Sequence, residues 1–258
     1  MSSPEATAKW VLETMGIARA GDIPAARLAE IADREGLKSL HKDYPMDSWD
    51  GMLLFTDRPR AILVNTYRGN SGRHHFTFAH ELGHYFMGHE PSFSGNGQRG
   101  FRCTVENGEK AKPRAETEAN RFAVELLMPE DQFRLDMSGA PIDFVLIGSL
   151  ASKYLVSKHA SSNRILSLTH TPCVIVRTRG TKIDGWTESR SARGFFRPMG
   201  TVPEGTTAHH VITYKRWQKD FEACDASLWL RCAVPSSTVF ECTHSDYESG
   251  VAMTILRW

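Results

Sequence analysis

"AHELGHYF", residues 79–86, is the stretch that indicates both the fold and the chemistry of the N-terminal half of the chain. In a helix, His80 and His84 stand one turn apart on the same side, so both imidazoles can reach a single ion. Glu81 lies about 100° round the helix from His80. This HExxH spacing is typical of zinc peptidases, in which the histidines bind Zn²⁺ and the glutamate takes a proton from the water that the metal activates.

The HExxH pattern is short, and random placement would produce it in roughly 3 of 100 chains of this composition. A catalytic zinc ion also needs a third protein ligand and an open fourth position. The prediction of a metal site therefore depends on a further ligand downstream of His84.

A second predicted helix supplies the candidates for that ligand. Residues 114–129, RAETEANRFAVELLMP, favour a helix that Pro129 ends, and they contain Glu116 and Glu118. At about 100° per residue, Glu116 shares a face with apolar side chains and Glu118 falls on the opposite, solvent-facing side. The first face holds Ala119, Ala123, Leu126 and Leu127, and the second holds Arg121 and Glu125. A carboxylate among apolar side chains is costly unless it is paired or bound to a metal, so Glu116 is the better candidate.

Asn120 lies one turn beyond Glu116 on the same side of this helix. A histidine that binds zinc needs a hydrogen-bond partner on its other ring nitrogen, and Asn120 is placed to supply one. The alternative is that Glu116 is an acid favoured by the helix dipole and Asn120 a surface amide. Both interpretations stay open.

The rest of the chain favours an α+β protein. We expect two helices within residues 5–36, a strand pair GMLLFTD (51–57) and AILVNTY (61–67), the HExxH helix over 73–87, and two helices with a turn near 155–157. The second strand of the pair is expected at the edge of its sheet, where it could hold an extended peptide. From residue 171 onward five segments read as strands: CVIVRTR, HHVITYKR, SLWLRCAV, TVFECTH and VAMTILRW.

Two stretches together resemble the ImmA/IrrE family of zinc metallopeptidases: FTFAHELGHYFMGHE at 76–90 and ETEANRFAVELLMP at 116–129. The segments GMLLF and AILVN before them fit the same pattern, and the resemblance covers residues 1–166. It implies three parts: a minimal zincin (thermolysin-like) metallopeptidase domain at 1–138, a helix-turn-helix-like segment at 139–168, and a small mixed α/β, GAF-like sensor domain at 169–258.

The resemblance also implies an activity and the residues that carry it. His80, His84 and Glu116 match the metal ligands of the family, and Glu81 matches its general base. Asn120 stands where zincins with a glutamate ligand often have aspartate. Family members typically cleave a helix-turn-helix (XRE-like) repressor and so turn on phage, mobile-element, DNA-damage or defence genes. We therefore expect a zinc endopeptidase with such a repressor as substrate, and Mn²⁺ as the alternative metal.

The charge of the chain is unevenly distributed. The total is only +1, yet residues 150–200 hold nine Lys or Arg against Asp184 and Glu188, a surplus of +7 that leaves −6 elsewhere. Within this segment Arg193 and Arg197 flank two phenylalanines, a combination able to bind phosphates and stack bases. We therefore expect single-stranded DNA as the activating signal, with these arginines as contacts. An exposed basic turn over two core phenylalanines is the alternative.

The sequence contains no membrane or export signal. No apolar run reaches 18 residues, and the N-terminus lacks a basic start followed by an apolar core. The five cysteines form no CxxC pair, which fits a reducing compartment. We therefore expect a cytoplasmic protein without a membrane partner.

Cys103 has a separate interpretation. It lies in residues 91–113, a stretch rich in Gly, Pro and polar residues that is expected to form a long loop over the site. A thiolate is a strong zinc ligand, so Cys103 could fill the fourth position and keep a peptidase inactive. An ordinary loop cysteine is the alternative.

Two other classes of function stay open. A DNA-binding regulator with a structural zinc would need four protein ligands and no base, so Glu81 would be dispensable. A non-proteolytic module that only holds a repressor would bind it without metal and release no fragments. If the chain is a peptidase, the group that stabilises the transition state is one of four candidates: Tyr85, His89, Tyr154 or His159.

Overall fold

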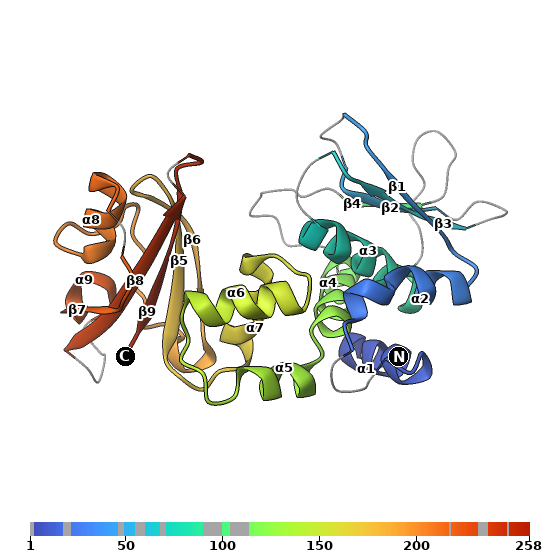
Figure 1. Ribbon diagram of the computed structural model, residues 1–258, viewed down its shortest axis with the longest axis horizontal. Helices are drawn as coiled ribbons and strands as arrows, with labels where there is room; N and C mark the ends of the chain where they lie inside the picture. Colours follow the sequence, from blue (N-terminus) through green and yellow to red (C-terminus); the bar gives the residue numbers. More distant parts are fainter. Residues whose placement is uncertain are drawn as a thin grey trace. The chain divides into compact units, whose positions relative to one another are not determined.

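The computed structural model of the chain describes most of its 258 residues. The described residues are 3–17, 22–45, 49–54, 60–67, 71–89, 114–216, 218–231, 237–246 and 248–258, together with the backbone of 100–103. They form two compact units. One comprises Met1–Ser138 with Ser149–Ala160, and the other Gly139–Gly148 with Ser161–Trp258. Each unit combines helices with one sheet, which confirms the α+β class (Figure 1).

The N-terminal unit contains the expected helices and also α5 (Glu130–Met137), which was not predicted. The other helices are α1 (Pro4–Thr14), the short 3-10 helix η1 (Pro24–Arg27), α2 (Leu28–Arg34), α3 (Ser71–Phe86) and α4 (Arg114–Leu127). The HExxH helix is α3, and its buried residues include the apolar Phe78, Ala79 and Leu82. This apolar stripe packs α3 against the sheet and against α4. Pro129 ends the preceding helix and stands at the N-cap of α5, as expected.

The sheet of this unit differs from the expectation at its edges. Its strands are β1 (Lys38–Lys42), β2 (Gly51–Leu54), β3 (Ala61–Asn65) and β4 (Gly100–Cys103), in the order β1-β3-β2-β4. The predicted antiparallel pair is present as β2 and β3. The prediction that the second of these strands is an edge was wrong, because β1 pairs with it in parallel on its other side. The edges described are β1 and β4.

Neither edge strand could be read from the hydrophobic pattern. β1 has the sequence KSLHK and is mostly exposed, so it lacks the alternation that marks a half-buried strand. β4 lies inside the Gly-rich stretch expected to be a loop, and it pairs antiparallel with β2. Backbone pairing with the buried neighbouring strands stabilises both.

The two-helix reading of the middle segment is confirmed. Helix α6 (Phe144–Lys153) and helix α7 (Lys158–Leu168) flank a turn in which Leu155 has a left-handed backbone, with φ of 54°. Five side chains were expected in the core of this segment: Leu150, Ala151, Val156 and Ile165 are buried, whereas Ala160 is only half-buried. The boundary between the two compact units passes through both helices.

The C-terminal unit is built on an antiparallel five-stranded sheet. Its strands are β5 (Cys173–Arg179), β6 (Lys182–Glu188), β7 (Glu222–Asp225), β8 (Thr238–Asp246) and β9 (Val251–Arg257), in the order β6-β5-β9-β8-β7. The other elements are η2 (Arg190–Ala192), α8 (Thr207–Tyr214) and α9 (Ala226–Trp229). Phe196 and Trp229 are fully buried in its core, with Val174, Val239 and Leu256 of the sheet. The GAF-like assignment of this unit stays a prediction.

Two of the five strand predictions in this unit were wrong. HHVITYKR belongs largely to helix α8, and SLWLRCAV begins within helix α9. Capping side chains explain both: Thr206 accepts a hydrogen bond from the backbone N–H of His209, and Asp225 accepts one from that of Ser227. These caps satisfy helical N–H groups and outweigh the strand propensity of the β-branched and aromatic residues.

No helix of the described residues is long and apolar enough to span a bilayer.

Candidate metal centre

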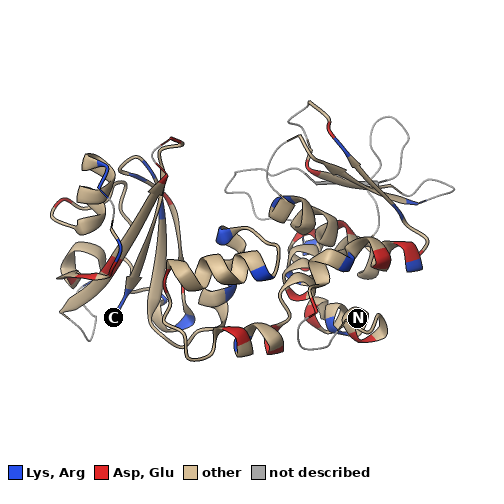
Figure 2. Ribbon diagram, in the orientation of Figure 1, with Lys and Arg blue, Asp and Glu red and all other residues tan. Residues whose placement is uncertain are grey.

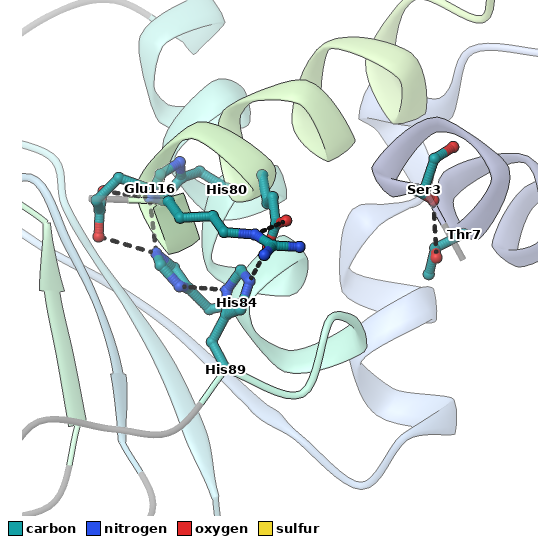
Figure 3. Close-up of polar contacts among 8 residues, drawn as sticks. Ser3, Thr7, His80, His84, His89 and Glu116 are labelled. Atoms are coloured by element: carbon teal, nitrogen blue, oxygen red, sulfur yellow. Dashed lines mark hydrogen bonds and ion pairs between the residues drawn. The ribbon is translucent and has the colours of Figure 1, made fainter. Parts of the chain in front are cut away.

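Three side chains from two helices converge on one point of the N-terminal unit (Figure 3). His80 and His84 of α3 are buried, and their Nε2 atoms lie 3.0 Å apart. Glu116, in the first turn of α4, places Oε2 at 3.3 Å from Nε2 of His80 and Oε1 at 3.3 Å from Nε2 of His84. The structure therefore brings together the three residues that the sequence indicated as metal ligands.

The spacing of these donor atoms fits a zinc ion. Zinc binds nitrogen and oxygen donors at about 2.0–2.1 Å, so the donors of a tetrahedral site lie about 3.3–3.4 Å apart. The three distances of 3.0, 3.3 and 3.3 Å are close to that value. Among the described residues, His80, His84 and Glu116 are the group whose donor atoms all lie within 4.8 Å of one another.

The protonation states of the group also suit a metal. Hydrogen bonds from His80 and His84 hold the pKa of the Glu116 carboxyl well below its usual value. Burial lowers the pKa of His84. A carboxylate anion and a neutral imidazole are the forms that bind a divalent cation.

Close packing of α3 on α4 lets Glu116 reach the histidines. A Cβ atom on Gly83 would lie 3.0 Å from both the Cα and the carbonyl oxygen of Ala119. Ala119 and Ala123 are fully buried. The small side chains of α4 thus permit the close approach of the two helices that the sequence predicted.

Glu81, the predicted general base, lies against the first residue of β2. Its side chain is fully buried, and a Cβ atom on Gly51 would lie 2.8 Å from Glu81 Oε1 and would collide with Thr77. Only glycine leaves room for the carboxylate there. Sequence reasoning missed Gly51, although a glycine within a strand often marks such a close approach.

Both histidines are held at the ring nitrogen that faces away from the ligand cluster. His80 Nδ1 lies 3.0 Å from Asn120 Oδ1, so the ring N–H donates to the amide oxygen. The contact predicted for Asn120 is therefore present. His84 Nδ1 lies 3.0 Å from Nδ1 of His89. Ring N–H groups engaged in this way leave the Nε2 lone pairs directed at a cation.

Helical geometry predicted that Glu118 and Glu125 lie on the solvent face of α4, and this prediction was wrong. The Glu118 side chain is only 20% exposed, and its carboxylate contacts His89 and Arg114. Glu125 is buried and accepts a hydrogen bond from the backbone N–H of Glu130. The chain that follows each of the helices α3 and α4 turns back over this face, which helical periodicity cannot anticipate.

Three of the four candidates for stabilising a transition state are engaged elsewhere. The hydroxyl of Tyr85 donates to Glu35, and that of Tyr154 donates to Asp136. The ring of His89 lies behind His84. His159 is exposed.

The remaining predicted residues lie outside this cluster. The backbone of Cys103 is in β4, where its register partner is Gly51. Its side chain is outside the described residues. Arg193 and Arg197 are exposed in the C-terminal unit, whereas Phe196 between them is fully buried. The Lys and Arg residues of the +7 segment are spread over several elements rather than gathered on one (Figure 2).

The fold and this histidine and glutamate cluster define a metallopeptidase-like domain. In a comparison with family models, residues 39–166 match the IrrE N-terminal-like domain of peptidase family M78. Residues 39–166 therefore form a domain of this family, which confirms the resemblance seen in the motifs.

The fold also occurs among solved structures. A Mycobacterium tuberculosis transcriptional regulator is similar with a TM-score of 0.58 and 13% sequence identity, over 98% of this chain and 76% of that chain. At this identity the likeness concerns the fold alone. No curated protein sequence matches the chain.

Proposed function

We propose that the chain is a zinc-dependent endopeptidase that cleaves a helix-turn-helix (XRE-like) transcriptional repressor. The observation that carries the proposal is the approach of Glu116 to within 3.3 Å of both His80 and His84, which suits a tetrahedral zinc ion. Membership of the M78 peptidase family supports peptide hydrolysis as the reaction. The structural neighbour described as a transcriptional regulator supports a regulatory role.

The residues divide the chemistry between them. A zinc ion held by His80, His84 and Glu116 would act as a Lewis acid toward the scissile carbonyl and lower the pKa of water. Glu81 accepts the proton of the attacking water at a carboxylate oxygen and returns it to the leaving amine. Burial of Glu81 beneath Gly51 keeps bulk water away from this base.

Cleavage of the repressor encoded beside the gene tests this proposal. The purified wild-type chain, Glu81→Gln and the control Glu13→Gln are each incubated with the repressor, and fragments are followed on a gel. Glu13 is an exposed glutamate of α1. Glu13→Gln therefore removes one negative charge, as Glu81→Gln does, but leaves the site intact. We expect equal rates for wild type and Glu13→Gln, and a loss of about 10²–10⁴-fold for Glu81→Gln.

Two results would contradict the proposal. Unchanged cleavage by Glu81→Gln would exclude Glu81 as the base. Repressor binding without fragments under every condition would favour a module that only holds the repressor.

We also propose that single-stranded DNA activates cleavage. Such a signal would suit a repressor that controls genes for the response to DNA damage or for phage defence. Arg193 and Arg197 are exposed and can contact phosphates. Binding should weaken as salt rises, and Arg193→Glu with Arg197→Glu should abolish DNA-stimulated cleavage while basal cleavage persists. DNA binding without salt dependence would contradict this assignment.

The division of the chain into a zincin-like part at 1–138, a helix-turn-helix-like part at 139–168 and a GAF-like part at 169–258 also belongs to the proposal.

We further propose that the Cys103 thiolate occupies the fourth position of the zinc ion and keeps the peptidase inactive until it is removed. The place of Cys103 in β4, in register with the glycine that covers Glu81, supports this role. Cys103→Ala should raise basal cleavage of the repressor, and Cys224→Ala is the matched control in the C-terminal unit. An unchanged basal rate in a folded Cys103→Ala protein would remove the latch from the proposal.

A further inference from the structure

The end of helix α3 brings another histidine to the back of the metal centre. Gly88 has a left-handed backbone with φ of 64°, and the backbone N–H of His89 donates to the carbonyl of His84 at 3.1 Å. This is the glycine-dependent C-terminal turn that closes many helices. It returns the His89 ring to His84, with ring centroids 5.0 Å apart and planes at 69°.

From His84 a line of hydrogen bonds runs outward across α4. Nδ1 of His84 and Nδ1 of His89 are 3.0 Å apart, and His89 Nε2 is 3.1 Å from Glu118 Oε2. Arg114 donates its Nε–H to the other Glu118 oxygen at 2.7 Å. The side chains of His89 and Glu118 are 10% and 20% exposed. Figure 3 shows His89 on the side of His84 away from Glu116.

The chemistry of these groups fixes the direction of the line. An ionised carboxylate only accepts hydrogen bonds, so His89 presents its Nε2–H to Glu118. With its proton on Nε2, the His89 ring has an acceptor at Nδ1, which takes the Nδ1–H of His84. His84 is left with its Nε2 lone pair facing Glu116 and His80. This is the tautomer that a metal ligand requires.

We propose that His89 and Glu118 are positioning residues that hold His84 in the orientation and tautomer needed to bind the metal. This inference rests on the proposed function, because it assumes that His84 binds zinc. Asn120 serves His80 by a single amide contact, whereas the contact behind His84 ends in a carboxylate. The line behind His84 thus includes a charged carboxylate, whereas the contact behind His80 is a neutral amide.

Zinc affinity, measured by competition with a chromophoric chelator, tests the inference without any activity assay. His89→Phe keeps the ring shape but has no nitrogen, and should weaken zinc binding about 10–100-fold. His89→Gln can still accept from His84 and donate to Glu118, so it should recover most of the affinity. His75→Ala is the control, since it removes another ring contact of α3, to the Leu155 carbonyl, away from the ligands.

A double-mutant cycle separates positioning from general destabilisation. Glu118→Ala alone should weaken zinc binding about 10-fold. In the His89→Phe background it should have no further effect, because both residues act through one line of contacts. In the Asn120→Ala background it should keep its full effect, because Asn120 acts on the other histidine.

Three results would overturn the inference. They are wild-type zinc affinity in a folded His89→Phe protein, equal losses for His89→Phe and His89→Gln, and full additivity of His89→Phe with Glu118→Ala. If the wild type itself binds no zinc, the proposed function fails together with the inference. If the wild type binds zinc and cleaves the repressor but His89→Phe binds as tightly, the inference alone fails.

Discussion

Each compact unit contains a shielded carboxylate, and the two have different surroundings. Glu241 of β8 is fully buried and accepts hydrogen bonds from the backbone N–H of Thr207 at 2.6 Å and from the indole N–H of Trp229 at 3.1 Å. These partners are obligate donors. Glu116 instead faces two imidazole nitrogens that can themselves bind a cation.

The difference separates a structural carboxylate from one suited to a metal. At Glu241 the protein supplies the donors, and the carboxylate ties the start of α8 to the sheet. At Glu116, two imidazole nitrogens lie 3.0 Å apart and each lies 3.3 Å from one carboxylate oxygen, an arrangement that a divalent cation satisfies. Burial alone therefore does not identify a functional acid, but the nature of its partners does.

Zinc should stabilise one unit and not the other, and this is the largest effect expected. At a free zinc concentration 100 times the dissociation constant, the gain is about 2.7 kcal/mol. Hydrogen exchange read by mass spectrometry should show this protection in α3 and α4, lost on chelation, while β8 and β9 remain unchanged. Equal protection of both units, or of neither, would break the comparison.

Two glycine substitutions should change stability in opposite directions. In Gly83→Ala the new methyl group meets the backbone of Ala119 at 3.0 Å, so α4 must shift, at a cost of about 1–3 kcal/mol and with weaker zinc binding. Gly148→Ala in α6 meets nothing within 4 Å and should stabilise by about 0.5–1 kcal/mol. Urea unfolding measures both. A neutral Gly83→Ala would show that the close approach of α3 and α4 is not required.

The smallest effect concerns the pH dependence of Glu241. Burial raises the pKa of this carboxyl above its ordinary value of 4.5, so the folded protein holds the proton more tightly than the unfolded chain. Stability from this group is complete below the unfolded pKa and is lost as pH rises through the folded pKa.

Glu241→Gln should remove the loss of stability that ionisation of Glu241 causes as pH rises. The amide keeps an acceptor oxygen for Trp229 but turns its NH2 group toward the backbone N–H of Thr207, so the substitution should cost about 1–3 kcal/mol at acid pH and less as pH rises. Urea unfolding from pH 4 to pH 8 measures the difference. A difference that grows with pH would mean that the ionised form is the one the fold stabilises.

The convergence of His80, His84 and Glu116 could be predicted from the sequence, because helical spacing puts the two histidines on one face, a carboxylate among apolar side chains needs a partner, and the family motifs match all three residues. The roles of His89 and Glu118 could not. They depend on the left-handed turn at Gly88, which carries the chain back over α4 after the periodic segment ends.

The sheets show the same limit. β2 and β3 carry the apolar pattern of strands and were predicted, whereas β1 is polar and exposed and is held by pairing with β3. Helix α8 looked like a strand by composition, but Thr206 caps it and Glu241, distant in sequence, binds its first N–H group. Long-range partners of this kind leave no local signal.

Metal content tests the central claim most directly. The wild type, Glu116→Ala and Glu241→Gln are purified alike, dialysed against zinc and desalted. The zinc content per protein molecule is then measured by inductively coupled plasma mass spectrometry. We expect an equimolar amount of zinc in the wild type and in Glu241→Gln, and little in Glu116→Ala. Equal zinc in all three proteins, or none in the wild type, would contradict it.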